Sequence, residues 1–161
     1  MTEETKAKIR RYNSNIAVSG RGVFAFGVWT AIKTIISVMF NITDIRNQLR
    51  DIPQEEIDNT IKLIYITMFV ICLLVLLIHG YVGISAVRYG RGRRKSKKFR
   101  IGAVILVFIT ISFIISDITS ASKAGYVQVA EFVADCTLLF MLIDMLYSMS
   151  MARLTVKREQ G

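Results

Sequence analysis

The sequence has few of the residues that metal sites and many catalytic sites need. Its 161 residues include one histidine, two cysteines and one proline. Cys72 and Cys136 each lie in an apolar run, without CxxC spacing or a neighbouring histidine cluster. We therefore predict that both cysteines are small buried hydrophobic residues. We expect no metal site and no cofactor.

Common catalytic signatures are also absent from the sequence. It contains no HExxH, GxSxG, phosphate-binding loop or EF-hand pattern. The segment GRGVFA at 20–25 matches a dinucleotide-binding turn in spacing, but no strand precedes it. Asp117 with Asp135 or Asp144 formally supplies the two acids of an intramembrane aspartyl protease, but the glycine-rich context that such enzymes use is missing. We therefore expect a protein that is not an enzyme.

Charge is missing from one long stretch, since 63–87 contains 25 residues without Lys, Arg, Asp or Glu. A helix of about 20 apolar residues is long enough to cross a bilayer. Three other apolar runs occupy about 23–42, 101–120 and 127–148. Together they predict an all-α membrane protein with four transmembrane helices in an antiparallel bundle, the first two forming a long hairpin that projects outside.

The basic residues indicate how these helices are oriented. The central loop carries eight of them and no acid: Arg88, Arg91, Arg93, Arg94, Lys95, Lys97, Lys98 and Arg100. Sixteen basic residues fall on 1–22, on this loop and after residue 149, against four on the other two loops. Lys and Arg in short loops stay on the cytoplasmic side. We therefore expect a multi-pass protein of the cell membrane, with cytoplasmic tails at 1–15 and 154–161 flanking a four-span domain at 16–153.

The first outer loop has the pattern of a helical hairpin. Residues 40–62 carry five acids against three bases. The apolar residues of this loop recur at helical spacing, namely Ile42, Ile45, Leu49 and Ile52, and the pattern continues with Ile57, Ile61 and Ile64. Pro53 and the acids that follow it suit the first turn of a new helix. The pattern predicts a bend near 51–53, and the alternative is an amphipathic helix that lies flat on the outer leaflet.

Several ionisable residues fall inside the apolar runs. They are Lys33, His79, Asp117, Glu131, Asp135 and Asp144. A charge at the bilayer centre costs about 3 kcal/mol on insertion scales, so each such residue needs a partner. Lys33 lies roughly 15 Å from the inner end of its helix and Asp135 roughly 12 Å from the outer edge, at about 1.5 Å per residue. We therefore predict a Lys33–Asp135 ion pair, with Glu131 as the alternative acid, and a buried, hydrogen-bonded His79.

Small residues form a ridge on the third predicted helix. Ser112, Ser116, Ser120 and Ala124 recur at intervals of four. Such ridges let helix backbones approach closely. The ridge predicts the tightest helix contact, within the chain or between copies, and the alternative is a polar pore lining.

Two classes of function remain open. The first is a non-enzymatic structural or accessory membrane protein, with the lipid bilayer and a second copy or another membrane protein as partners. The second is a subunit of a small channel or transporter with a polar path lined by Lys33, Asp135, Glu131 and His79. The basic loop is read as an orientation signal, with attraction of anionic lipids or phosphorylation at Ser96 as alternatives. A nucleic-acid partner is not expected, because the basic residues adjoin membrane spans.

Overall fold

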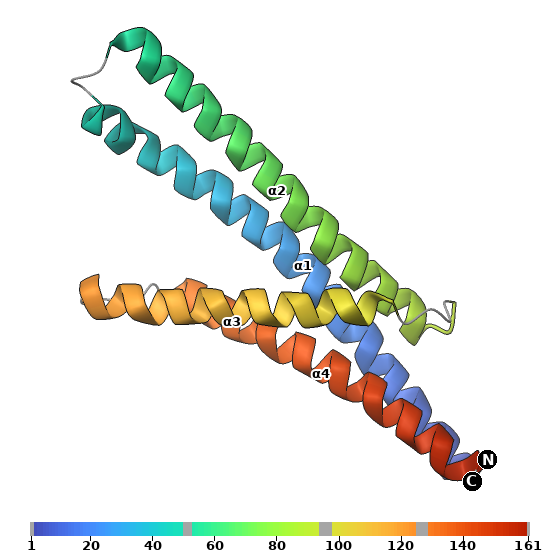
Figure 1. The fold of residues 1–161 in the computed structure, drawn as a ribbon. Helices are drawn as coiled ribbons and strands as arrows, with labels where there is room; N and C mark the ends of the chain where they lie inside the picture. The colour runs from blue at the N-terminus through green and yellow to red at the C-terminus, as the bar shows by residue number, and fades with distance from the viewer. Residues whose placement is uncertain (1, 50–52, 94–97, 125–128, 161) are drawn as a thin grey trace. The chain divides into compact units, whose positions relative to one another are not determined.

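The computed structural model describes residues 2–49, 53–93, 98–124 and 129–160, except the side chains of 48, 120–124, 159 and 160. The chain forms four helices: α1 (Glu3–Gln48), α2 (Gln54–Gly90), α3 (Phe99–Ala124) and α4 (Val129–Gln160) (Figure 1). No strand occurs among these described residues. The predicted all-helical class is confirmed.

Three of the helices are long and apolar enough to cross a membrane, namely α1, α2 and α3. The fourth helix, α4, carries Glu131, Asp135 and Asp144 and is not among them. Each helix is longer than the apolar run that predicted it, because residues outside the run continue the helix, beyond both ends for α1, α2 and α3 and beyond the C-terminal end for α4. Length and composition therefore agree with a membrane protein.

Local chemistry accounts for where the helices begin and end. The amides of Glu56 and Ile57 donate to the carbonyl oxygen of Pro53 at 3.0 and 3.2 Å. Pro53 therefore directly precedes α2, one position before the first turn that the sequence predicts for it, and residues 51 and 52 of the predicted bend lie outside the described residues. At the other end of α2, Gly92 adopts a φ of 71°. This left-handed conformation suits glycine and turns the chain away from the helix.

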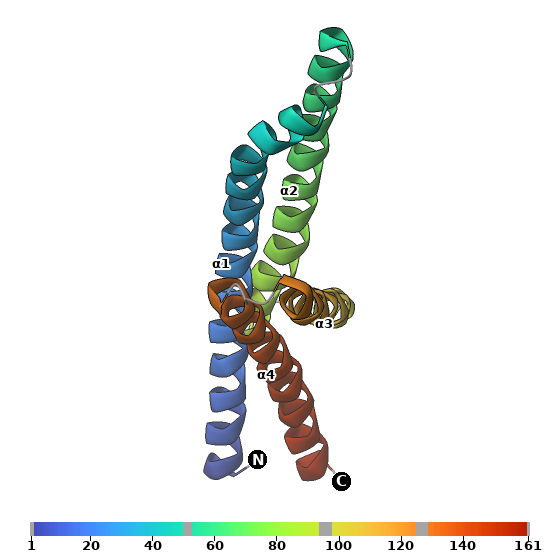
Figure 2. The same ribbon diagram turned by 90° about the vertical axis from the view of Figure 1, so that its left-hand side faces the viewer.

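The chain divides into two compact units, and the first of these comprises Gly27–Ile78. In it the C-terminal half of α1 lies beside the N-terminal half of α2 (Figures 1 and 2). Ile57 and Ile61 are buried, as the predicted apolar face requires. The Cys72 thiol is buried and contacts the carbonyl oxygen of Ala31 at 3.7 Å. The hairpin interpretation is therefore supported, and its projection beyond the bilayer stays a prediction.

The second unit comprises Met1–Phe26 and His79–Gly161 and contains the main core. The first turn of α1 and the last turn of α4 lie at the same end of this unit (Figures 1 and 2). All four helices contribute buried apolar side chains. The core consists of Ile16, Val23, Val82, Ala86, Phe99, Ala103, Leu106, Leu138, Leu142, Met145 and Met149.

Glycines set the distance between α1 and α2 inside this unit. A Cβ atom on Gly83 would lie 2.6 Å from the carbonyl oxygen of Gly20, and one on Gly20 would lie 2.7 Å from the Cβ of Ala86. A Cβ on Gly90 would likewise meet the backbone of Asn13 and Ala17. The two backbones are therefore in direct contact, which small residues permit in membrane helices.

Replacing Gly83 with alanine should destabilise the protein, since the methyl group has no space beside Gly20. Overpacking of this kind costs about 1 to 3 kcal/mol. Gly80→Ala is the matched control, because the nearest atom to its new Cβ is the ring of Phe24 at 4.0 Å. Thermal unfolding in detergent measures both variants. Equal melting temperatures for the two would contradict the close crossing.

Candidate functional site

A hydrogen bond between two polar side chains joins α1 to α4 in the larger unit. The Ser19 hydroxyl donates to Asp144 Oδ2 at 2.7 Å. Ser19 is buried and Asp144 is half-buried. Ser148 lies one turn after Asp144 and is 1% exposed, and its hydroxyl has no hydrogen-bond partner among the described residues. These three residues form a polar cluster in which Ser19 donates a hydrogen bond to Asp144, while the nearby Ser148 hydroxyl has no described hydrogen-bond partner.

A cavity of about 330 Å³ opens beside these groups. It is lined by Lys8, Arg11, Tyr12, Asn15, Asp144, Tyr147 and Ser148. The Lys8 ammonium lies 2.7 Å from Glu4 Oε1, and this pairing lowers the pKa of Glu4 and raises the pKa of Lys8. Lys8 is therefore held by Glu4, whereas Asp144 takes its hydrogen bond from Ser19.

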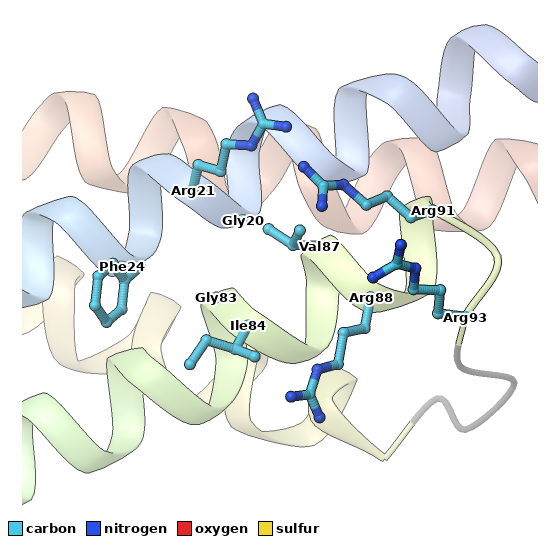
Figure 3. Close-up of a pocket in the computed structure, with 9 residues that line it drawn as sticks. All are labelled: Gly20, Arg21, Phe24, Gly83, Ile84, Val87, Arg88, Arg91 and Arg93. Carbon is cyan, nitrogen blue, oxygen red and sulfur yellow. The ribbon is translucent and has the colours of Figure 1, made fainter.

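A second cavity lies where α1 and α2 cross and has a volume of about 320 Å³. We call it the arginine groove; it is lined by Gly20, Arg21, Phe24, Gly83, Ile84, Val87, Arg88, Arg91 and Arg93. Figure 3 shows Arg21, Arg91 and Arg93 on one side of α2, while Arg88 extends away from them. Guanidinium groups from two helices and the following turn therefore border one hollow.

The described residues that line the arginine groove include no acid. The sequence has no Asp or Glu from 5 to 43 or from 59 to 116. None of the four guanidinium groups forms an ion pair within the described part of the chain. The groove is therefore a concentrated positive site without an internal counterion.

The predicted intramembrane residues fall in both units. Lys33 belongs to the Gly27–Ile78 unit, whereas Glu131 and Asp135 lie on α4 in the other unit. All three side chains are half-buried, and each has an interaction partner. The Lys33–Asp135 pair therefore stays a prediction. His79 is 7% exposed and has an interaction partner, in agreement with its expected burial. One carboxylate oxygen of Asp117 is buried and accepts no hydrogen bond from a described residue.

The serine ridge of α3 is described at two of its four positions. Ser112 and Ser116 are exposed, and the Ser112 hydroxyl donates back to the carbonyl oxygen of Phe108 at 3.0 Å. The side chains of Ser120 and Ala124 lie outside the described residues. The helix contact of the ridge stays a prediction, and the exposure of the two described serines leaves them accessible to a second copy.

The basic loop is only partly described. Arg94, Lys95, Ser96 and Lys97 lie outside the described residues. Of the others, Arg100 on α3 approaches the Ser150 hydroxyl on α4 at 3.5 Å. Within the described ranges, no group of three or more His, Cys, Asp or Glu side chains could hold a metal ion.

Sequence reasoning did not find the α1–α2 crossing or the Ser19–Asp144 bond. A signal for the crossing exists, because Ala17 and Gly20 on α1 and Gly83, Ala86 and Gly90 on α2 recur at spacings of three or four. The proximity of Arg21 to the arginines of the central loop follows from the contact between Gly20 and Gly83, so it could not be predicted before that contact was known. Ser19 carries no comparable signal, since a single serine in an apolar helix is common.

Comparison with protein-family models, curated proteins and solved structures found no match. The function is therefore inferred from the geometry.

The Ser19–Asp144 bond and the unpartnered Ser148 give opposite expectations for two serine-to-alanine changes. Ser19→Ala should lower the free energy of unfolding by about 0.6 to 1.7 kcal/mol, the average and maximum for cross-helix hydrogen bonds in a membrane protein. Ser148→Ala should be neutral or stabilising, because it removes a buried hydroxyl that bonds to nothing described. Unfolding in mixed micelles measures both. A loss for Ser148→Ala as large as that for Ser19→Ala would refute this assignment.

Proposed function

We propose that this protein is a four-span integral membrane protein with both termini in the cytoplasm and a structural or accessory role rather than an enzymatic one. The observation that carries the proposal is the hydrogen bond that joins Asp144 of α4 to Ser19 of α1 beside the main core. The adjacent Leu142 and Met145 are 0% exposed. An acid used in this way stabilises a helix contact.

The proposal requires α4 to span the membrane despite its three acids. Its surface supports this, because Val133, Phe140, Ile143 and Tyr147 are between 51% and 70% exposed. Exposed apolar surface of this extent is unusual in water and normal against lipid. The hydrogen bond to Asp144 offsets part of the cost of burying one acid.

The order of contacts supports an antiparallel bundle. Ser19 of α1 meets Asp144 of α4, and Gly22, one turn later, meets Met141, which is one turn earlier in its helix. Between α1 and α2, Gly20 faces Ala86 and the later Phe24 faces Gly83. In both pairs the residue numbers rise along one helix as they fall along the other, which is the order expected for antiparallel helices.

The partners follow from the same surface. The bilayer would cover the apolar side chains on the outside of the helices. The exposed Ser112 and Ser116 offer a close-approach face on α3, which suits a second copy or another membrane protein.

Cysteine labelling tests the proposed topology in a variant without Cys72 and Cys136. Cysteines at Gln54 and Lys123, in the two predicted outer loops, should react with an impermeant thiol reagent applied to intact cells. Cysteines at Arg93 and Lys157 should react only after the membrane is opened. Equal labelling of positions 123 and 157 in intact cells would show that α4 does not cross the membrane.

A channel or transporter subunit is the second candidate, and the cavity beside Asp144 favours it. An unpartnered serine hydroxyl in such a cavity could contact water or an ion. In this case Lys33, Asp135, Glu131 and His79 would line the path. Proteoliposomes with the purified protein should show the same ion and proton flux as empty liposomes if the role is accessory. Flux that is abolished by Asp135→Asn would favour the channel.

A further inference from the structure

The arginine groove has the charge distribution of an anion site. Arg21, Arg91 and Arg93 border one hollow and have no acidic partner among the described residues. Like charges that converge in this way repel one another, and the repulsion is relieved when an anion binds between them. Guanidinium groups recognise phosphate through paired hydrogen bonds, which adds geometric specificity to the charge.

The walls of the groove are apolar on the side of the helix crossing. Phe24 and Ile84 are 44% and 47% exposed, and Val87 is half-buried beside them. The crossing at Gly20 and Gly83 fixes the two helices at backbone contact, so Arg21 is held one residue from the contact point. Charge and apolar surface therefore adjoin within one cavity of about 320 Å³.

We propose that the arginine groove binds the phosphate of an anionic membrane lipid, with the start of its acyl chains against Phe24 and Ile84. A free phosphate ion would use the guanidinium groups alone and would leave the apolar wall uncovered. A lipid uses both. This inference rests on the proposed function for the location of the groove at the cytoplasmic surface, where anionic lipids give about 1 kcal/mol per nearby basic residue.

The test compares lipid retention by the full-length protein in detergent micelles doped with dioleoyl phosphatidic acid, phosphatidylglycerol or phosphatidylcholine. Bound lipid is quantified after gel filtration. The groove variant is Arg21→Gln/Arg91→Gln/Arg93→Gln. The matched control is Arg10→Gln/Lys98→Gln/Arg158→Gln, which removes the same charge at exposed positions that do not line the groove.

The wild-type protein and the control should retain the two anionic lipids with affinities within about twofold of each other, and phosphatidylcholine should be lost. The groove variant should bind the anionic lipids at least tenfold more weakly, since three basic contacts are removed. An equal loss in both triple variants, or equal retention of phosphatidylcholine by the wild type, would overturn the proposal. Displacement of the lipid by millimolar inorganic phosphate would overturn the lipid source and leave a phosphate site.

A charge-reversal variant and the cysteine-labelling experiment separate the lipid site from the membrane topology. The single change Arg93→Glu, on an exposed residue after the end of α2, reverses one charge without altering the core and should weaken binding more than Lys98→Glu does. The labelling experiment tests orientation separately. Lipid selectivity with a reversed topology would refute the proposed function alone, and a correct topology without selectivity would refute the groove alone.

Discussion

The larger unit depends on the backbone contact between α1 and α2 at Gly20 and Gly83. Because a Cβ on Gly83 would lie 2.6 Å from the opposite carbonyl oxygen, no other residue fits there without separating the helices. The contact brings Val23 and Val82 into the common core and holds Arg21 near the arginines at the end of α2. Core packing and the positive groove thus have the same geometric origin.

The polar contact between Ser19 and Asp144 lies beside the apolar core of the same unit. Asp144 receives a hydrogen bond from Ser19, and the core of the unit is formed by aliphatic and methionine side chains together with Phe99. In a membrane the hydrophobic effect contributes little between helices, because lipid is as apolar as the core. Close packing at small residues and cross-helix hydrogen bonds such as Ser19–Asp144 are therefore the available means of specifying the arrangement.

Charge and apolar surface are segregated along the chain. Acids are absent from 5–43 and 59–116. Many basic residues of these ranges lie near the start of α1 or around the end of α2 and the start of α3, whereas Arg21 and Lys33 lie inside α1. The lateral surfaces carry exposed Phe, Ile and Leu side chains, such as Ile101 and Phe108 at 70% and 67% exposure. This segregation agrees with helices that lie in lipid and present their basic ends to one surface.

The sequence by itself determined the helical class, the start of α2 after Pro53 and the apolar face of Ile57 and Ile61, because hydropathy and helical period are local properties of the chain. It also supplied the burial of His79 and Cys72, whereas Cys136, for which burial is predicted as well, is half-buried. Which small residues make contact was decided only by the tertiary structure. Ser112 and Ser116 of the regularly spaced ridge on α3 are exposed, while the less regularly spaced glycines of α1 and α2 are in contact, because spacing defines a face of a helix but not what that face packs against. The grouping of Arg21 with Arg91 and Arg93, some 70 residues apart in the sequence, likewise depends on that helix crossing.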